Sequence, residues 1–314
     1  GFLAVAWTDA FQAMLMLAAL LITPIAVINE AGGTGAVLDQ LEQINSENTN
    51  LFANLTLLGF VSLIAWGLGY AGQPHILARF MAVEDPQKLN SSKWIAMGWM
   101  LVVLFGSVST GLAGITYFVG QPLANPETVF IILSQSLFNP WIAGIITAAI
   151  LSAIMSTIDS QLLVSSSVIS EDFYRVFVRP KASEKELLLV SRIAVVVIAL
   201  LALAIASDRN SRVLELVSYA WAGFGAAFGP VIIFSLFWRS MTALSAVIGM
   251  VVGAVTVVVW SNLSGGLFEL YEIVPGFLFA SLSIVFINLL KAEQNESTLS
   301  QYDDVQDSLA ASDY

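Results

Sequence analysis

A polar stretch inside a long apolar segment contains the first candidate site. Residues 153–161 carry several hydroxyls within the apolar segment 141–168. In a helix, Ala153, Ser156 and Thr157 stand at i, i+3 and i+4, so one backbone carbonyl and two hydroxyls share one side. A hard monovalent cation prefers such oxygen ligands and, by analogy with divalent ions, needs about five or six of them. The spacing therefore predicts part of a cation site. The alternative is that the hydroxyls bond back to their own helix or join neighbouring helices.

A second candidate site lies in residues 66–75. Three glycines and Pro74 weaken a helix there, because glycine is flexible and proline removes an amide donor. We expect a break or strong bend, which a bilayer tolerates only where protein or a water-filled cavity receives the freed backbone groups. Trp66, Tyr70 and Pro74 recur at i, i+4 and i+8, so in a helix they would form one face around a small apolar ring. The alternative is ordinary helix packing or an interfacial aromatic belt.

Three ionisable side chains lie in or near these segments. Asp159 is the carboxylate that we expect inside an apolar segment, where an acid is a functional candidate, although it could also be a solvated group at the segment's end. His75, the one histidine of the chain, is more often structural than a proton relay. Arg79 is interpreted as an anchor at the membrane surface. We find no phosphate-binding glycine loop, metal-binding His/Cys cluster or Ser/His pair that would indicate an enzyme.

The composition indicates that a bilayer surrounds these segments. Of the 314 residues, 57% are hydrophobic and 11% are charged, whereas a soluble domain carries roughly 25% charged residues. Apolar runs of about 20 residues recur, long enough to cross a hydrocarbon core roughly 30 Å thick. The chain is therefore predicted to be an all-α polytopic membrane protein with about eight spans. These spans are 9–28, 56–80, 94–118, 141–168, 187–206, 213–237, 243–261 and 273–290.

The basic residues predict the orientation of the chain. With the amino end inside, ten basic residues fall on the inner side and two on the outer side, so both termini are expected in the cytoplasm. The inner residues are Arg79, Lys88, Lys93, Arg175, Arg179, Lys181, Lys185, Arg192, Arg239 and Lys291, and the outer ones are Arg209 and Arg212. Residues 34–48 and 127–138 are predicted to form short amphipathic helices on the outer surface.

The net charge of −11 argues against a nucleic-acid partner, and part of it is concentrated at the carboxyl end. We predict a transmembrane domain over residues 1–291 and an acidic, disordered cytoplasmic tail over residues 292–314. The acids of this tail are Glu293, Glu296, Asp303, Asp304, Asp307 and Asp313. The chain has no cysteine, which removes disulfides and thiolate metal sites from consideration.

Several runs of the sequence are distinctive, namely residues 66–70, 72–80, 155–157 with 161–163, and 218–230. They closely resemble the proline-transporting members of the sodium:solute symporter family, and the resemblance extends over residues 1 to about 290. The resemblance implies an inverted-repeat fold of two five-helix units. It implies that the first span ends the first repeat, that the next five spans form the second repeat, and that two helices follow. On that mapping, four core helices and one further amino-terminal helix would be missing from the sequence.

The resemblance also implies an activity and residue roles. It implies symport of sodium and L-proline into the cell by alternating access, across a bacterial inner membrane surrounded by lipid. Sodium is the coupling ion and no other cofactor is expected. Carried over by motif, Ala153, Ser156 and Thr157 correspond to half of a sodium site, and Trp66, Tyr70 and Pro74 to part of a proline pocket.

Three alternatives stay open from the sequence. Transporter-like modules also serve as sensory input domains joined to histidine kinases, although a kinase would need hundreds of further residues. The solute could be a small molecule related to proline. The chain could also be a truncated product without activity. Sequence does not distinguish sodium from proton coupling, and it does not indicate the oligomeric state.

Overall fold

The computed structural model describes residues 2–85, 87–207, 212–290 and 296–311. Within these ranges the chain is built of helices joined by turns, with no strand, as the sequence predicts. Four charged residues that were counted for the orientation or for the acidic tail lie outside the described residues, namely Arg209, Lys291, Glu293 and Asp313.

The chain divides into two compact units, and each is described by itself. Unit 1 comprises Gly1–Asn54 and Asp85–Leu200, and unit 2 comprises Leu55–Glu84 and Leu201–Tyr314. Both units are therefore made from separate stretches of the sequence.

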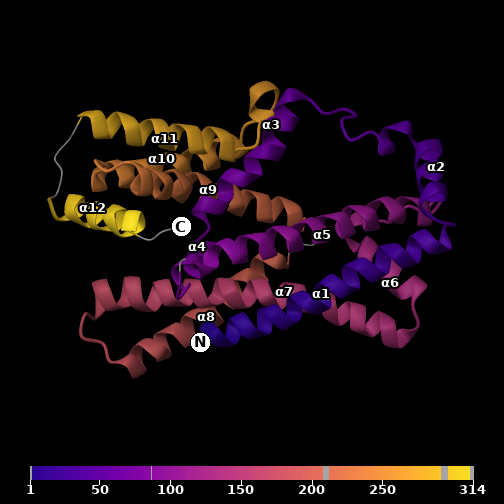
Figure 1. Ribbon diagram of the computed structural model, residues 1–314, viewed down its shortest axis with the longest axis horizontal. Coiled ribbons are helices and arrows are strands. Elements are labelled where there is room, and N and C mark those ends of the chain that lie inside the picture. Colours follow the sequence, from indigo (N-terminus) through magenta and orange to yellow (C-terminus); the bar gives the residue numbers. More distant parts are fainter. Residues whose placement is uncertain (1, 86, 208–211, 291–295, 312–314) are drawn as a thin grey trace. The chain divides into compact units, whose positions relative to one another are not determined.

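Unit 1 is organised around its first helix. Helix α1 packs against α5, α6 and α7 (Figure 1). Small residues such as Ala19 and Ala149 lie buried where the helices meet, which allows close approach. The Asn139 side chain caps α7 by accepting bonds from the amides of Trp141 and Ile142, both 3.1 Å long. The elements are α1 (Phe2–Glu30), α2 (Thr34–Ile44), η1 (Ser46–Thr49), α5 (Lys88–Tyr117), η3 (Pro126–Thr128), α6 (Val129–Leu137), α7 (Pro140–Ser167), η4 (Val168–Val178) and most of α8 (Glu184–Ala206).

Unit 2 is organised around α9, which packs against η2, α10 and α11, while α10 and α11 lie side by side (Figure 1). Its core joins Ala65, Ala222, Ala226, Val257 and Ile273. Three of these five are alanines, so helix backbones come close together. The elements are α3 (Leu57–Ala65), η2 (Trp66–Gly72), α4 (Pro74–Met81), α9 (Val213–Phe237), α10 (Ala243–Ser261), η5 (Gly266–Glu269), α11 (Ile273–Leu290) and α12 (Glu296–Ala311).

The helices agree with a multi-pass membrane protein. Within the described residues, seven helices are long and apolar enough to cross a bilayer. The remaining predicted span, 56–80, which is the second along the chain, is present but divided into α3, η2 and α4. The two predicted amphipathic segments are also helical, as α2 and as η3 followed by α6.

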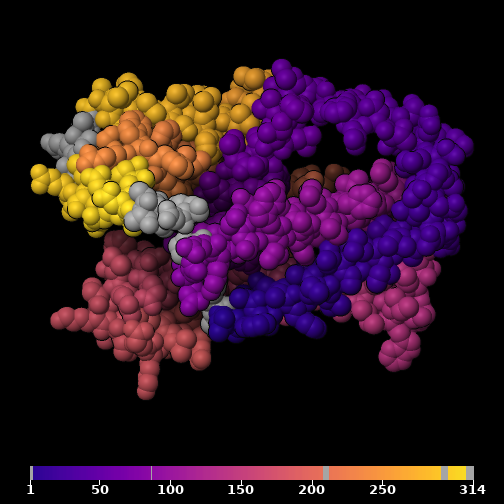
Figure 2. Space-filling model, in the orientation of Figure 1, coloured from indigo at the N-terminus to yellow at the C-terminus, as the bar shows by residue number. Residues whose placement is uncertain are grey.

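The carboxyl-terminal tail differs from the sequence-based prediction. Residues 292–314 were expected to be disordered, but Glu296–Ala311 form helix α12. The Arg239 guanidinium, in the turn between α9 and α10, forms two bonds of 2.7 and 2.6 Å with the Asp303 carboxylate. Figure 2 shows α12 in yellow beside orange atoms of unit 2. This ion pair gives the helix a protein partner that composition does not reveal.

Candidate functional site

The predicted break in the second span is confirmed. The chain leaves the α-helix at Ala65, runs as a 3-10 helix through Trp66–Gly72, and passes through Gln73 in an extended conformation (φ −85°, ψ 114°). Pro74 then occupies the first turn of α4, where its missing amide costs no helical hydrogen bond.

Glycines allow the broken segment to lie directly against α9. A methyl group on Gly72 would collide with the carbonyl oxygen of Phe224, and would lie 2.8 Å from Gly225 Cα and 2.9 Å from Gly229 N. A methyl group on Gly69 would overlap the Trp221 indole. The glycines therefore permit a contact between two backbones as well as weakening the helix.

Two of the three residues predicted for the substrate converge on an aromatic partner from α9. The Trp66 and Trp221 rings stack with centroids 5.6 Å apart and planes 15° apart. The Tyr70 ring meets Trp221 edge-on, at 4.9 Å and 85°. Tyr70 is 41% exposed, so part of its ring remains available for contact. The aromatic cluster of Trp66, Tyr70 and Trp221 is thus built by two elements far apart in the sequence.

The predicted geometry of this face is wrong, although the residues come together. The i, i+4, i+8 spacing assumed an α-helix, but η2 has the 3-10 geometry of about three residues per turn. Trp66 and Tyr70 therefore meet through Trp221 and not through a shared helical face. Pro74 begins α4, and its role at the substrate stays a prediction.

Polar contacts hold the break in place. The Trp221 indole nitrogen donates a 2.9 Å hydrogen bond to the Trp66 carbonyl. The Gln73 side-chain amide donates a 3.2 Å bond to the Trp221 carbonyl, and Gln73 is only 4% exposed. Both bonds satisfy backbone carbonyls near the break, which membrane depth demands. Trp221 lies in the run 218–230, which the sequence showed only as part of the family resemblance, so this role of Trp221 was not predicted.

The three residues predicted for sodium lie together on α7. The hydroxyls of Ser156 and Thr157 donate to the Ala153 carbonyl at 3.0 and 3.3 Å. The spacing thus gathers three oxygens, as predicted. The same bonds also fit the alternative in which the hydroxyls bond back to their own helix. Thr157 is exposed, so its hydroxyl is accessible to a cation that is also bound by oxygen atoms of another segment.

A carboxylate beside this stretch was missed from the sequence. The Ser160 hydroxyl lies 2.9 Å from the Ser156 carbonyl and 3.4 Å from an oxygen of the Asp9 carboxylate on α1. The first span was predicted to begin at residue 9, but α1 begins at Phe2. Asp9 therefore lies within a helix long and apolar enough to cross a bilayer, as Asp159 does in α7, so Asp159 is not the one carboxylate in such a segment.

The cation-ligand candidates belong to unit 1 and the aromatic cluster to unit 2. The residues of each set can therefore be substituted without changing those of the other set. The candidate cation ligands lie on α7, whereas the aromatic cluster lies on η2 and α9.

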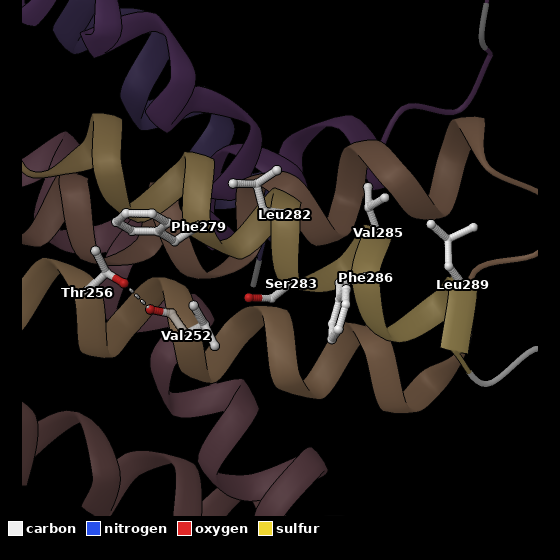
Figure 3. Close-up of a pocket in the computed structure, with 8 residues that line it drawn as sticks. All are labelled: Val252, Thr256, Phe279, Leu282, Ser283, Val285, Phe286 and Leu289. Carbon is white, nitrogen blue, oxygen red and sulfur yellow. Dashed lines mark hydrogen bonds between the residues drawn. The ribbon is translucent and has the colours of Figure 1, made fainter.

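A groove between α10 and α11 is chemically different from both sets. Its volume is about 560 Å³, and it is lined mainly by apolar side chains, including Phe279, Leu282 and Phe286 (Figure 3). The Thr256 hydroxyl in it bonds to the Val252 carbonyl of its own helix, at 2.7 Å. The lining carries no charged group among the described residues, so it does not match the charged ends of an amino acid.

An all-helical fold with a broken membrane-spanning helix is typical of secondary transporters. A sequence model of the "sodium:solute symporter family" matches residues 1–253. The chain belongs to the sodium:solute symporter family, whose members are transporters and not enzymes.

Relatives in this family carry specific names. The chain is 52% identical over 316 residues to a sodium/proline symporter of Haemophilus influenzae, covering 96% of this chain and 63% of the relative. It is 46% identical over 313 residues to the high-affinity proline transporter PutP of Bacillus subtilis, covering 99% of this chain and 66% of the relative. The chain thus spans a little under two thirds of the length of these relatives.

A solved structure confirms the predicted fold class. A substrate-bound, outward-open Na⁺-coupled sialic acid symporter matches with a TM-score of 0.72 at 18% identity, covering 94% of this chain and 64% of that one. The all-α, inverted-repeat transporter fold predicted from the sequence is therefore the fold of the chain.

Proposed function

We propose that the protein containing this chain takes up L-proline by sodium-coupled symport with alternating access. The observation that carries the proposal is the helix break in unit 2 with the Trp66 and Tyr70 rings beside it. The names of the relatives, sodium/proline symporter and high-affinity proline transporter, support the choice of solute and ion.

The substrate side of the proposal rests on the aromatic cluster. Proline presents a small apolar ring, which aromatic faces enclose well. Trp66 is held by Trp221, whereas Tyr70 keeps 41% of its surface exposed and offers a hydroxyl. Pro74 completes the predicted set at the start of α4. Broken helices near the membrane midplane are the usual place for such a site in transporters.

The ion side of the proposal rests on α7. We assign the Ala153 carbonyl and the Ser156 and Thr157 hydroxyls as sodium ligands, because they offer hard oxygen atoms within one helical turn. Asp9 adds a negative charge beside the same stretch through Ser160. Sodium needs further ligands, which must come from another segment of the protein.

The cellular setting follows from the same arguments. We place the protein in a bacterial inner membrane, with both ends of this chain in the cytoplasm, on the strength of its basic-residue distribution. We assign α1 to the end of a first repeat, α3 to α9 to the second repeat, and α10 and α11 to two additional helices.

Uptake into proteoliposomes tests this proposal. The complete gene product is reconstituted, and labelled proline uptake is measured under an inward sodium gradient, a matched potassium gradient and a proton gradient. The proposal expects uptake with sodium only, inhibited by excess unlabelled proline. Uptake driven equally by the proton gradient, or absent with sodium, would reject it.

A further inference from the structure

Tyr271 joins three elements of unit 2 at the aromatic cluster. It lies between η5 and α11, outside both helices. Its backbone amide donates a 3.0 Å bond to the Ser62 hydroxyl of α3, and its phenol hydroxyl donates a 2.7 Å bond to the Ser218 carbonyl of α9. Its ring stacks with Trp66, with centroids 5.9 Å apart and planes 18° apart. One side chain in a connecting segment thus contacts the helix before the break, the break itself and α9.

These contacts restrict the Trp66 ring. Trp66 lies nearly parallel to both Trp221 and Tyr271, with interplanar angles of 15° and 18°. Its carbonyl is held separately, by the Trp221 indole. Trp221 therefore fixes both the backbone and the ring at this position, whereas Tyr271 acts on the ring. Removing the Tyr271 side chain would take away one of the two rings that stack on Trp66. It would leave the hydrogen bond from Trp221 to the Trp66 carbonyl intact.

The Tyr271 hydroxyl is suited to act as a permanent hydrogen-bond donor. Burial, and then the neighbouring Glu272 carboxylate, raise the pKa of the Tyr271 hydroxyl. The hydroxyl therefore stays protonated at physiological pH and keeps its bond to Ser218. Tyr271 also packs against the hydrophobic core that contains Ala65, Ala222 and Ile273.

We propose that Tyr271 is a positioning residue that orients Trp66 for the solute, so that the segment between α10 and α11 sets solute affinity. The inference rests on the proposed function, because it assigns Trp66 to the solute. Tyr271 acts through Trp66 and does not itself need to touch the solute. Its hydrogen bonds to Ser62 and Ser218 and its stacking on Trp66 all lie within unit 2, whereas the predicted sodium ligands belong to unit 1.

The test compares Tyr271→Phe and Tyr271→Ala with the unchanged protein, in complete gene product reconstituted into proteoliposomes. The proline KM, the maximal rate and the half-saturating sodium concentration are measured for each. Tyr271→Phe keeps the ring and removes one hydrogen bond, so the proline KM should rise about fivefold. Tyr271→Ala should raise it more, while the sodium value stays within about twofold. Tyr117→Phe is the control, since that ring packs on Phe118 in unit 1.

A double-mutant cycle separates positioning from general stability. In a Trp66→Ala background, Tyr271→Phe should raise the proline KM no further, because the ring that it orients is gone. The inference is overturned if Tyr271→Phe behaves like Tyr117→Phe. It is also overturned if the effects of Tyr271→Phe and Trp66→Ala multiply, or if the sodium value changes as much as the proline KM. Absence of sodium-driven uptake in the unchanged protein would reject the proposed function itself, which is a different result.

Discussion

The Trp221 indole donates a 2.9 Å hydrogen bond to the Trp66 carbonyl while the two rings stack 5.6 Å apart. One side chain therefore satisfies the broken backbone and supports the ring beside it. The space that the indole occupies exists because residue 69 is glycine. The helix break and its aromatic partner thus depend on each other.

Replacing Trp221 by Phe should weaken the binding of proline. Phe keeps an aromatic face but cannot donate to the part-buried Trp66 carbonyl, and loss of such a hydrogen bond costs about 1 kcal/mol or more. We expect the proline KM to rise roughly fivefold or more. Trp141→Phe is the matched control, because Trp141 is 87% exposed. Equal KM values for the two variants, measured by uptake kinetics, would contradict the role of Trp221.

Replacing Gly72 by Ala should destabilise unit 2. The added methyl group meets backbone atoms of α9, which cannot move aside as a flexible side chain would. Such overpacking costs about 1–3 kcal/mol. The thermal unfolding midpoint in detergent should fall by several degrees. Gly67→Ala is the control, since a methyl group there meets nothing within 4 Å. The close contact would be refuted if both variants unfolded at the same temperature.

The sequence predicted the break but not its partners. Three glycines and Pro74 weaken a helix wherever they occur, so the local signal was sufficient. The 3-10 geometry and the contact with Trp221 arise from packing against α9, about 150 positions away. No local pattern encodes which helix will lie against the break, so an assumption of α-helical spacing gave the wrong face.

Boundaries and charged segments limited the rest of the prediction. Asp9 was placed at the edge of the first span, because apolar runs are recognised by their centres and a helix continues through occasional polar residues. Helix α12 was predicted to be disordered from its composition, since four described acids and few apolar residues provide little core. Its ion pair with Arg239 is again a contact distant in sequence.

Replacing Asp9 by Asn should lower the apparent affinity for sodium. The substitution keeps the shape of the side chain and removes a negative charge beside Ser160, whose hydroxyl bonds the Ser156 carbonyl. Charge-assisted bonds contribute about 1.5–3 kcal/mol, so the half-saturating sodium concentration should rise at least about tenfold. Sodium-dependence curves of uptake would measure this. Asp159→Asn is the comparison, and a larger effect there would contradict the assignment.

Acid should release α12 from its partner. The Arg239 guanidinium lowers the pKa of the Asp303 carboxyl through hydrogen bonds. A carboxyl with a lowered folded-state pKa stabilises the docked helix above its unfolded pKa of about 3.9 and loses that contribution as the pH falls through the folded value. Docking should therefore persist at neutral pH and weaken only below about pH 4. Because both side chains are exposed, high salt should also weaken it.

Spin labels can follow this docking, because the chain has no cysteine and accepts a labelled pair at Ser240→Cys and Ser308→Cys. The distance between the labels should increase in acid. In an Arg239→Gln background it should no longer respond to acidification, since the partner of Asp303 is gone. If the distance between the labels in the unchanged protein changed with neither acid nor salt, the ion pair would not be what holds α12.

Separate solute and ion sites are tested most directly by comparing Trp66→Ala with Thr157→Ala. Both variants of the complete gene product are reconstituted, and the proline KM and the half-saturating sodium concentration are determined for each. Trp66→Ala should raise the proline KM with little change in sodium dependence, as should Tyr70→Ala. Thr157→Ala and Ser156→Ala should shift sodium dependence about tenfold or more, with Thr157→Ser milder because it keeps the hydroxyl. Equal losses of both affinities in every variant, or normal sodium dependence without either hydroxyl, would contradict separate solute and ion sites.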